Sequence, residues 1–252
     1  MKHVVFDVDD VMVDTDAAVV AALRALDPRI GPLLKTHYET LISHLRGENP
    51  PAYPPLRKRI EAWQRELTEV KQWSRETLVA ICYEDVGVTP RKADIEREAA
   101  AYWKAITDET VVYEDAATIA RACLDRGISI HFATNSDGFL GFDEAKRTFT
   151  YDPQDSAQRK IARLHLLRPH GMHEGNITVG DPIGKPHPDF YEKALRGLDR
   201  AATLVVGDSL SNDVLPFLKA GAAHGVWLRR HGGGGEQGVP AVRTLLELDR
   251  FL

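Results

Sequence analysis

The chain has 252 residues, of which 43% are hydrophobic and 27% are charged, enough for one substantial hydrophobic core and a smaller second one. Its net charge of −5 argues against a nucleic-acid partner, because nucleic-acid phosphates demand a basic face. No apolar run approaches the length of a membrane span, and no signal peptide is visible. Cys82 and Cys123 lie far apart and outside any metal-binding spacing. These features predict a soluble cytoplasmic protein.

The first predicted strand, residues 3–6, is followed at once by a cluster of aspartates. Its sequence, HVVF, is the apolar, β-branched run that is typical of a buried parallel strand. Asp7, Asp9 and Asp10 come directly after it, and Asp14 follows. Carboxylates this close together repel one another, and their burial is costly without a compensating cation. The cluster therefore predicts a bound cation at the end of the first strand.

Residues 16–115 have a different pattern, with apolar side chains at helical spacing throughout. The stretches AAVVAALRAL and RKADIEREAAAYWKAIT show this spacing clearly. We interpret this segment as an all-helical cap domain inserted between the first strand and the rest of the chain.

The remainder of the chain alternates predicted strands with predicted helices. Strands are expected at 128–133, 176–180, 202–207 and 225–228, and helices at 189–198 and 212–221, the last ending at Gly221. Such alternation predicts an α/β fold with a doubly wound, Rossmann-like parallel sheet. Residues 1–15 and 116–252 would form this core domain.

In an open α/β sheet the ligand binds beyond the carboxyl ends of the strands. Asp7 and Asp9 follow the first strand, and Thr134 and Asn135 end the second. Asp208 follows the strand at 202–207, with Asp213 five residues on, and Lys185 lies in the sequence GKPHPDF before a helix. The fold therefore predicts that these residues gather at one edge of the sheet.

These residue types can transfer a phosphoryl group through an aspartate. Asp7 can attack phosphorus as a nucleophile and form an aspartyl-phosphate. Asp9, two residues on, can protonate the leaving oxygen and later deprotonate a water. Thr134 and Asn135 can hold the phosphoryl oxygens, and Lys185 can neutralise negative charge.

The surplus aspartates predict a Mg²⁺ ion, which prefers oxygen ligands from carboxylates, phosphate and water. Asp7 and Asp208 would bind the ion directly, together with the backbone carbonyl of Asp9. Asp213 would be an outer-shell or secondary ligand.

The sequences VVFDVDDV, FATNS, GKPHPDF and VVGDSLSND resemble the four ordered motifs of the haloacid dehalogenase-like (HAD) hydrolases. The resemblance covers residues 1–15 and about 115–230. It implies that Asp7 is the nucleophile, Asp9 the acid/base and Lys185 the stabilising lysine. It also implies that Thr134 binds phosphate and that Asp208 is a Mg²⁺ ligand. A helical cap between the first two motifs is common in the family.

The sequence departs from the family pattern at Asp10-Val11, where the family usually has Gly-Thr. The presence of Asp9 disfavours dehalogenase and phosphonate-cleaving activity, because such members lack an acid/base there. The resemblance therefore favours hydrolysis of a phosphate ester of a small metabolite. A phosphomutase shares the same residues, and a non-catalytic binding protein on the same scaffold is a third hypothesis. The sequence does not indicate the physiological substrate or the oligomeric state.

Overall fold

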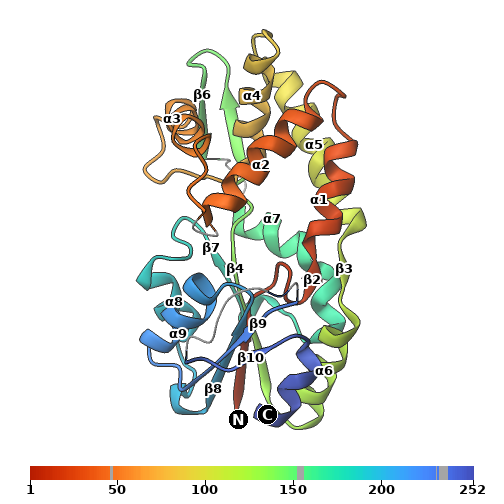
Figure 1. Ribbon diagram of the computed structural model, residues 1–252, viewed down its shortest axis with the longest axis vertical. Coiled ribbons are helices and arrows are strands. Elements are labelled where there is room, and N and C mark those ends of the chain that lie inside the picture. The colour runs from red at the N-terminus through yellow and green to blue at the C-terminus, as the bar shows by residue number, and fades with distance from the viewer. Residues whose placement is uncertain (46–47, 152–155, 231, 233–237) are drawn as a thin grey trace. The chain divides into compact units, whose positions relative to one another are not determined.

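The computed structural model describes residues 1–45, 48–151, 156–230, 232 and 238–252 (Figure 1). The chain divides into two compact units. We call Met1–Thr15, Thr110–Ser136 and Ala157–Leu252 the sheet unit, and Asp16–Glu109 with Asp137–Ser156 the helical unit. Within the described residues, no helix is long and apolar enough to cross a membrane.

The sheet unit is built on a six-stranded sheet in which every neighbouring pair is parallel. Its strands are β1 (His3–Phe6), β4 (Ser129–Asn135), β7 (Ile177–Gly180), β8 (Thr203–Gly207), β9 (His224–Leu228) and β10 (Ala241–Val242). The order across the sheet is β10-β9-β8-β1-β4-β7. The predicted α/β class and all five predicted strands are confirmed. The short edge strand β10 was not predicted.

Helical segments cover both faces of this sheet (Figure 1). Val4 and Phe6 of β1 pack in one core cluster with α6 (Glu114–Asp125) and the 3₁₀ helix η5 (Leu245–Phe251). Val5 points to the opposite face and packs with α8 (Pro188–Ala194) and α9 (Leu215–Lys219). This alternation along one strand is the pattern of a sheet that is buried on both sides.

The two predicted helices of the sheet unit are shorter than their sequence patterns. α8 ends at Ala194 rather than at residue 198. The predicted helix at 212–221 is a π-helical turn, η4 (Leu210–Val214), followed by the short α9. Gly221 ends this region as predicted, with a φ of 102° that favours glycine.

The remaining elements of the sheet unit are short. β2 (Val13–Asp14) pairs antiparallel with β3 (Val111–Val112). α7 (Ser156–Arg163) leads into the 3₁₀ helix η1 (Leu164–His170), and two single 3₁₀ turns follow, η2 (Glu174–Asn176) and η3 (Arg200–Ala202).

The helical unit contains α1, which begins at Thr15, and four further helices. Their bounds are α1 (Thr15–Arg24), α2 (Gly31–Leu45), α3 (Tyr53–Trp63), α4 (Arg75–Asp85) and α5 (Lys92–Glu109). Its core includes the buried Ile60, Leu78, Ile81 and Tyr102. These helices agree with the helical pattern of residues 16–115.

The helical unit differs from the predicted range of 16–115 in two respects. Residues 110–115 belong to the sheet unit, and the helical unit also contains a β-hairpin from further along the chain. This hairpin consists of β5 (Leu140–Asp143) and β6 (Thr148–Tyr151). The rings of Phe142 and Phe149 pack against Trp63, with centroids 5.7 and 5.9 Å away. This aromatic contact explains why residues 137–156 belong to the helical unit rather than to the sheet unit.

Candidate active site

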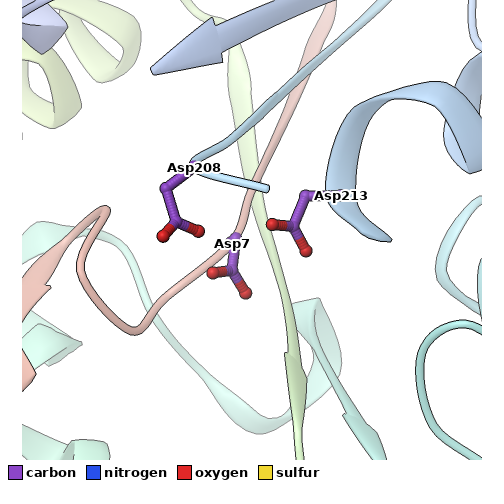
Figure 2. Close-up of side chains that lie close together, drawn as sticks. All are labelled: Asp7, Asp208 and Asp213. Carbon is purple, nitrogen blue, oxygen red and sulfur yellow. The ribbon is translucent and has the colours of Figure 1, made fainter. Parts of the chain in front are cut away.

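Three carboxylates converge at the carboxyl ends of β1 and β8 (Figure 2). β1 and β8 are adjacent, with Phe6 opposite Val206, so Asp7 and Asp208 leave the sheet side by side. Asp213 comes from η4 and approaches them because Gly207 has no side chain. A Cβ atom on Gly207 would lie only 2.1 Å from the Cβ of Asp213.

One oxygen from each of Asp7, Asp208 and Asp213 lies within 4.8 Å of the other two. Burial, together with repulsion from Asp213 and Asp9, raises the pKa of Asp7 to about 7. The pKa of Asp208 is raised as well. Its side chain reaches solvent, but neighbouring atoms remove much of the water around the carboxylate, and Asp213 and Asp7 repel its negative charge. Oxygen donors that repel each other in this way fit a divalent cation such as Mg²⁺.

Lys185 neutralises part of this negative charge. Its Nζ donates to Oδ1 of Asp7 at 2.6 Å and to Oδ1 of Asp213 at 2.7 Å. Burial alone would lower the pKa of Lys185, but Asp213 and Asp7 outweigh burial and raise it. Lys185 is therefore a buried, charged partner of both Asp7 and Asp213.

Asn135 positions the loop that carries Lys185. Its Oδ1 accepts a hydrogen bond from the backbone N–H of Lys185 at 2.7 Å. A Cβ on Gly184 would lie 2.5 Å from this Oδ1, and one on Gly180 would lie 2.8 Å from it. Glycine is needed at both positions for this close approach. The side chain of Asn135 thus helps to position Lys185. A role of Asn135 in binding phosphoryl oxygens stays a prediction.

Asp9 lies apart from the group of three carboxylates, in a set of four hydrogen bonds. Its Oδ1 accepts from the hydroxyl of Thr15 at 2.9 Å and from Arg163 at 2.9 Å. Its Oδ2 accepts from Nζ of Lys160 at 2.7 Å and from the hydroxyl of Thr134 at 3.2 Å. Burial would raise the pKa of Asp9, but Lys160 and Arg163 hold it well below its usual range. Asp9 is therefore ionised in this arrangement.

Sequence reasoning missed Lys160 and Arg163, which lie three residues apart on α7. Their side chains are only 1% and 4% exposed. The only signal in the sequence is that a helix would place both on one face. Arg159 is an equally basic neighbour, so the sequence does not indicate which of these cations is buried against Asp9.

Asp10 occupies the position where the family pattern has glycine, and its backbone has the left-handed φ of 58°. Aspartate tolerates this conformation better than most residues. Its carboxylate also accepts a hydrogen bond from the backbone N–H of Thr15 at 3.1 Å. Arg230 supports the turn by donating to the carbonyl of Val11 at 2.8 Å. The turn that glycine usually allows is therefore retained with aspartate.

The fold is shared with many solved structures. The HAD-hydrolase YfnB from Bacillus subtilis, bound to magnesium, matches with a TM-score of 0.60 and 16% identity, covering 99% of this chain and 97% of that one. A HAD phosphatase from Thermococcus onnurineus matches with a TM-score of 0.55 and 17% identity, covering 100% and 97%. A 2-haloacid dehalogenase from Pseudomonas syringae pv. Tomato matches with a TM-score of 0.57 and 20% identity, covering 99% and 97%.

A comparison with curated proteins finds no match. The identities to the solved structures are low, so these similarities show the fold and not the substrate. The family model for haloacid dehalogenase-like hydrolases matches residues 1–221, which is most of the chain. This match agrees with the order of the four motifs and with the parallel sheet that carries them. The chain belongs to the haloacid dehalogenase-like hydrolase family.

Proposed function

We propose that this hydrolase is a Mg²⁺-dependent phosphatase that removes the phosphoryl group from a small phosphorylated metabolite. The observation that carries the proposal is the position of Asp7. Its carboxylate contacts the ammonium group of Lys185 at 2.6 Å and lies close to the carboxylates of Asp208 and Asp213. An anionic nucleophile beside a fixed cation suits attack on a phosphoryl group, whose own charge must be neutralised.

In the first step, a carboxylate oxygen of Asp7 forms a bond to phosphorus while the bond from phosphorus to the leaving oxygen breaks. In the second step, the oxygen of a water molecule attacks phosphorus and the bond to Asp7 breaks, which releases inorganic phosphate. Lys185 balances negative charge in both steps because it contacts Asp7 directly. Thr134 would hold a phosphoryl oxygen through its hydroxyl group. This hydroxyl donates a hydrogen bond to Oδ2 of Asp9, which places it in the site.

Asp9 is the proposed acid/base, and its contacts affect the two steps differently. The ionised carboxylate is the state required to accept a proton from the attacking water. Donation of a proton to the leaving group requires Asp9 to be protonated first, which Lys160 and Arg163 oppose. Leaving groups that need little protonation, such as phenolates, should therefore depart faster than alkoxides.

The carboxylates of Asp7 and Asp208 would hold the Mg²⁺ ion, with the backbone carbonyl of Asp9, and Asp213 would support them from outside. When bound, the ion supplies positive charge against which the phosphoryl oxygens can be placed. The mutual repulsion of the three carboxylates supports this assignment. The similar fold of YfnB was solved with magnesium bound. A cytoplasmic location remains part of the proposal, supported by the free thiols of Cys82 and Cys123.

The test is release of inorganic phosphate from a panel of aryl and alkyl phosphate esters, with Mg²⁺ and with EDTA. We expect turnover that EDTA abolishes and that is faster for aryl esters. The Asp7→Asn variant should lose turnover by at least about a thousandfold, because its amide is not a nucleophile, while its unfolding curve stays close to that of the wild type. Retained turnover in this variant would contradict the mechanism.

Two further arms separate the alternatives. Chloride release from 2-chloropropionate, without phosphate release from any ester, would identify a dehalogenase. Conversion of a sugar phosphate into its isomer without phosphate release would identify a phosphomutase. Binding of esters without any conversion would leave a non-catalytic binding protein.

A further inference from the structure

Arg75 is a buried arginine of the helical unit that has no carboxylate partner. It begins α4, and only 6% of the residue is exposed. Its Nη1 donates to the carbonyl oxygen of Trp73 at 2.8 Å. Its Nε is buried and has no hydrogen-bond partner. Among the described residues, no carboxylate lies within ion-pair distance of the guanidinium.

This arrangement is energetically unusual, since a buried cation is normally paired with an anion. Arg59 of the same unit shows the normal pattern, with Asp85 at 2.7 Å and Glu84 at 3.2 Å. Burial alone would lower the pKa of Arg75, but Tyr102, Tyr38 and the charge of Asp137 together outweigh burial and raise it. Arg75 is therefore a full positive charge that the surrounding protein neutralises only in part.

Four aromatic rings surround the guanidinium, from α2, the segment before α4, and α5, which lie beside one another (Figure 1). The Cζ atom of Arg75 lies 4.8 Å from the ring centre of Tyr38, 5.0 Å from Tyr102, 5.8 Å from Trp103 and 5.9 Å from Trp73. We call these four rings the aromatic box. Such rings stabilise a cation through their faces without accepting its hydrogen bonds.

One ring of the aromatic box is fixed by a buried carboxyl group. The indole N–H of Trp103 donates to Oε1 of Glu76 at 3.2 Å, and the hydroxyl of Ser74 donates to Oε2 at 2.8 Å. Burial raises the pKa of Glu76, with these hydrogen bonds opposing the rise. Both oxygens of Glu76 are thus used to hold the box rather than to pair with Arg75.

A second polar group in the box also has no partner. The hydroxyl of Tyr102 is fully buried beside the guanidinium, and within the described part of the chain it has no partner that meets the geometry of a hydrogen bond. Its ring is one of those facing Arg75, so two unpaired donors, Nε–H and O–H, belong to one small region. A buried donor without an acceptor destabilises the folded protein. An acceptor that carries negative charge would satisfy both and would pair the guanidinium.

We propose that Arg75 and Tyr102 form an oxyanion-binding site in the helical unit, which takes the carboxylate or phosphate group of a small molecule whose apolar part lies against the aromatic box. The site is independent of the proposed phosphatase activity, because it contains none of the residues assigned to that reaction. Its ligand class follows from the charge of Arg75, the two donors and the apolar walls.

The test measures binding directly, with sodium acetate, sodium benzoate and inorganic phosphate as probes. Thermal unfolding and tryptophan fluorescence are recorded for the wild type, Arg75→Met, Tyr102→Phe and Arg57→Met. Arg57 is the matched control, because it lies in the same unit but is paired with Glu61 at 2.7 Å. Comparison of acetate with benzoate tests whether the aromatic box contacts the apolar part of the ligand. Comparison of benzoate with phosphate tests whether the site prefers a carboxylate or a phosphate group.

We expect at least one probe to raise the midpoint of unfolding of the wild type and of R57M. R75M should bind that probe at least about tenfold more weakly, and Y102F several-fold more weakly, since each loses a donor to the anion. Without the probe, the midpoint of R75M should equal or exceed that of the wild type, because an unpaired buried charge is removed.

Two outcomes would overturn the proposal. No effect of any probe on the wild type would show that the site takes no oxyanion. Equal binding by R75M and the wild type would assign the effect to another part of the chain, including the carboxylate site with Lys185. In the first of these outcomes, a lower midpoint of R75M would make Arg75 a structural centre of the aromatic box.

Discussion

Replacement of Lys160 by methionine should destabilise the protein and raise the pKa of Asp9. Lys160 is 1% exposed at its side chain, and its Nζ lies 2.7 Å from Oδ2 of Asp9. Methionine has a similar length and fills the space of the lysine stem, so the change removes mainly the charge and its hydrogen bond. Asp9 retains Arg163 at 2.9 Å and the hydroxyls of Thr15 and Thr134.

The magnitude follows from these contacts. Loss of one partner of a buried ion pair costs about 3–5 kcal/mol when it leaves a charge alone. Asp9 is not left alone, and its side chain is 32% exposed, so we expect a smaller loss of about 1–3 kcal/mol in the free energy of unfolding. Because each pKa unit corresponds to about 1.4 kcal/mol, the pKa of Asp9 should rise by about one to two units.

The loss of unfolding free energy in K160M should be larger at neutral pH than at acid pH. The pKa of Asp9 is lower in the folded protein than in the unfolded one, where it is about 3.9. Its stabilising contribution is therefore complete above this unfolded value and is lost as the pH falls towards the folded value. The difference between wild type and K160M in urea unfolding should be largest at pH 7 and should shrink below about pH 4.

Lys2→Met is the matched control, because Lys2 pairs with Asp199 at 2.8 Å in the same unit but with side chains 69% and 43% exposed. It should leave the free energy of unfolding almost unchanged, because solvent screens an exposed pair. K160M should also narrow the difference between aryl and alkyl ester turnover, since Asp9 is then more easily protonated. Unfolding of K160M that coincides with that of K2M, or a loss that is the same at every pH, would refute this reasoning.

Two further predictions concern the carboxylate group. Protons compete with Mg²⁺ for Asp7, whose pKa is raised to about 7, so calorimetric titration should show Mg²⁺ affinity rising from pH 5 to pH 8; a flat profile would contradict the assignment. Gly207→Ala should displace Asp213, since the added Cβ would lie 2.1 Å from the Cβ of Asp213. Turnover should fall at least about tenfold, which corresponds to a loss of roughly 1.4 kcal/mol of transition-state stabilisation. Unchanged turnover in G207A would show that the position of Asp213 is unimportant.

The positions of Asp7 and Asp208 could be predicted from the sequence because two rules are enough to locate them. Short apolar runs identify buried parallel strands, and residues after such strands meet at one edge of the sheet. Asp7 follows β1 and Asp208 follows β8, and these two strands are neighbours. Lys185 was expected at the same edge because it lies in a loop before a helix, and the family motif added its role as the stabilising lysine.

The partners of Asp9 could not be predicted in this way. Lys160 and Arg163 lie more than 150 residues from Asp9 in the chain, on a helix with several basic residues. Burial of a lysine depends on the tertiary partner that compensates its charge, and local sequence does not record that partner. The place of the hairpin that contains Phe142 and Phe149 could not be predicted either. Its apolar residues indicate that it is buried, but they do not indicate which of the two units it packs against.

The contacts divide the charges of the site into two groups. Asp7, Asp208 and Asp213 share one cation, Lys185, so the group has two negative charges in excess when all are ionised. The raised pKa values of Asp7 and Asp208 show that protons partly offset this excess. A divalent cation would offset it without protonating the nucleophile.

The second group consists of Asp9 with Lys160 and Arg163, which lie 2.7 and 2.9 Å from its carboxylate oxygens. These two cations hold the pKa of Asp9 well below its usual range, which keeps this carboxylate ionised beside the other group. Because K160M removes one of them, it should change the order of preference among phosphate esters, whereas K2M should leave that order unchanged.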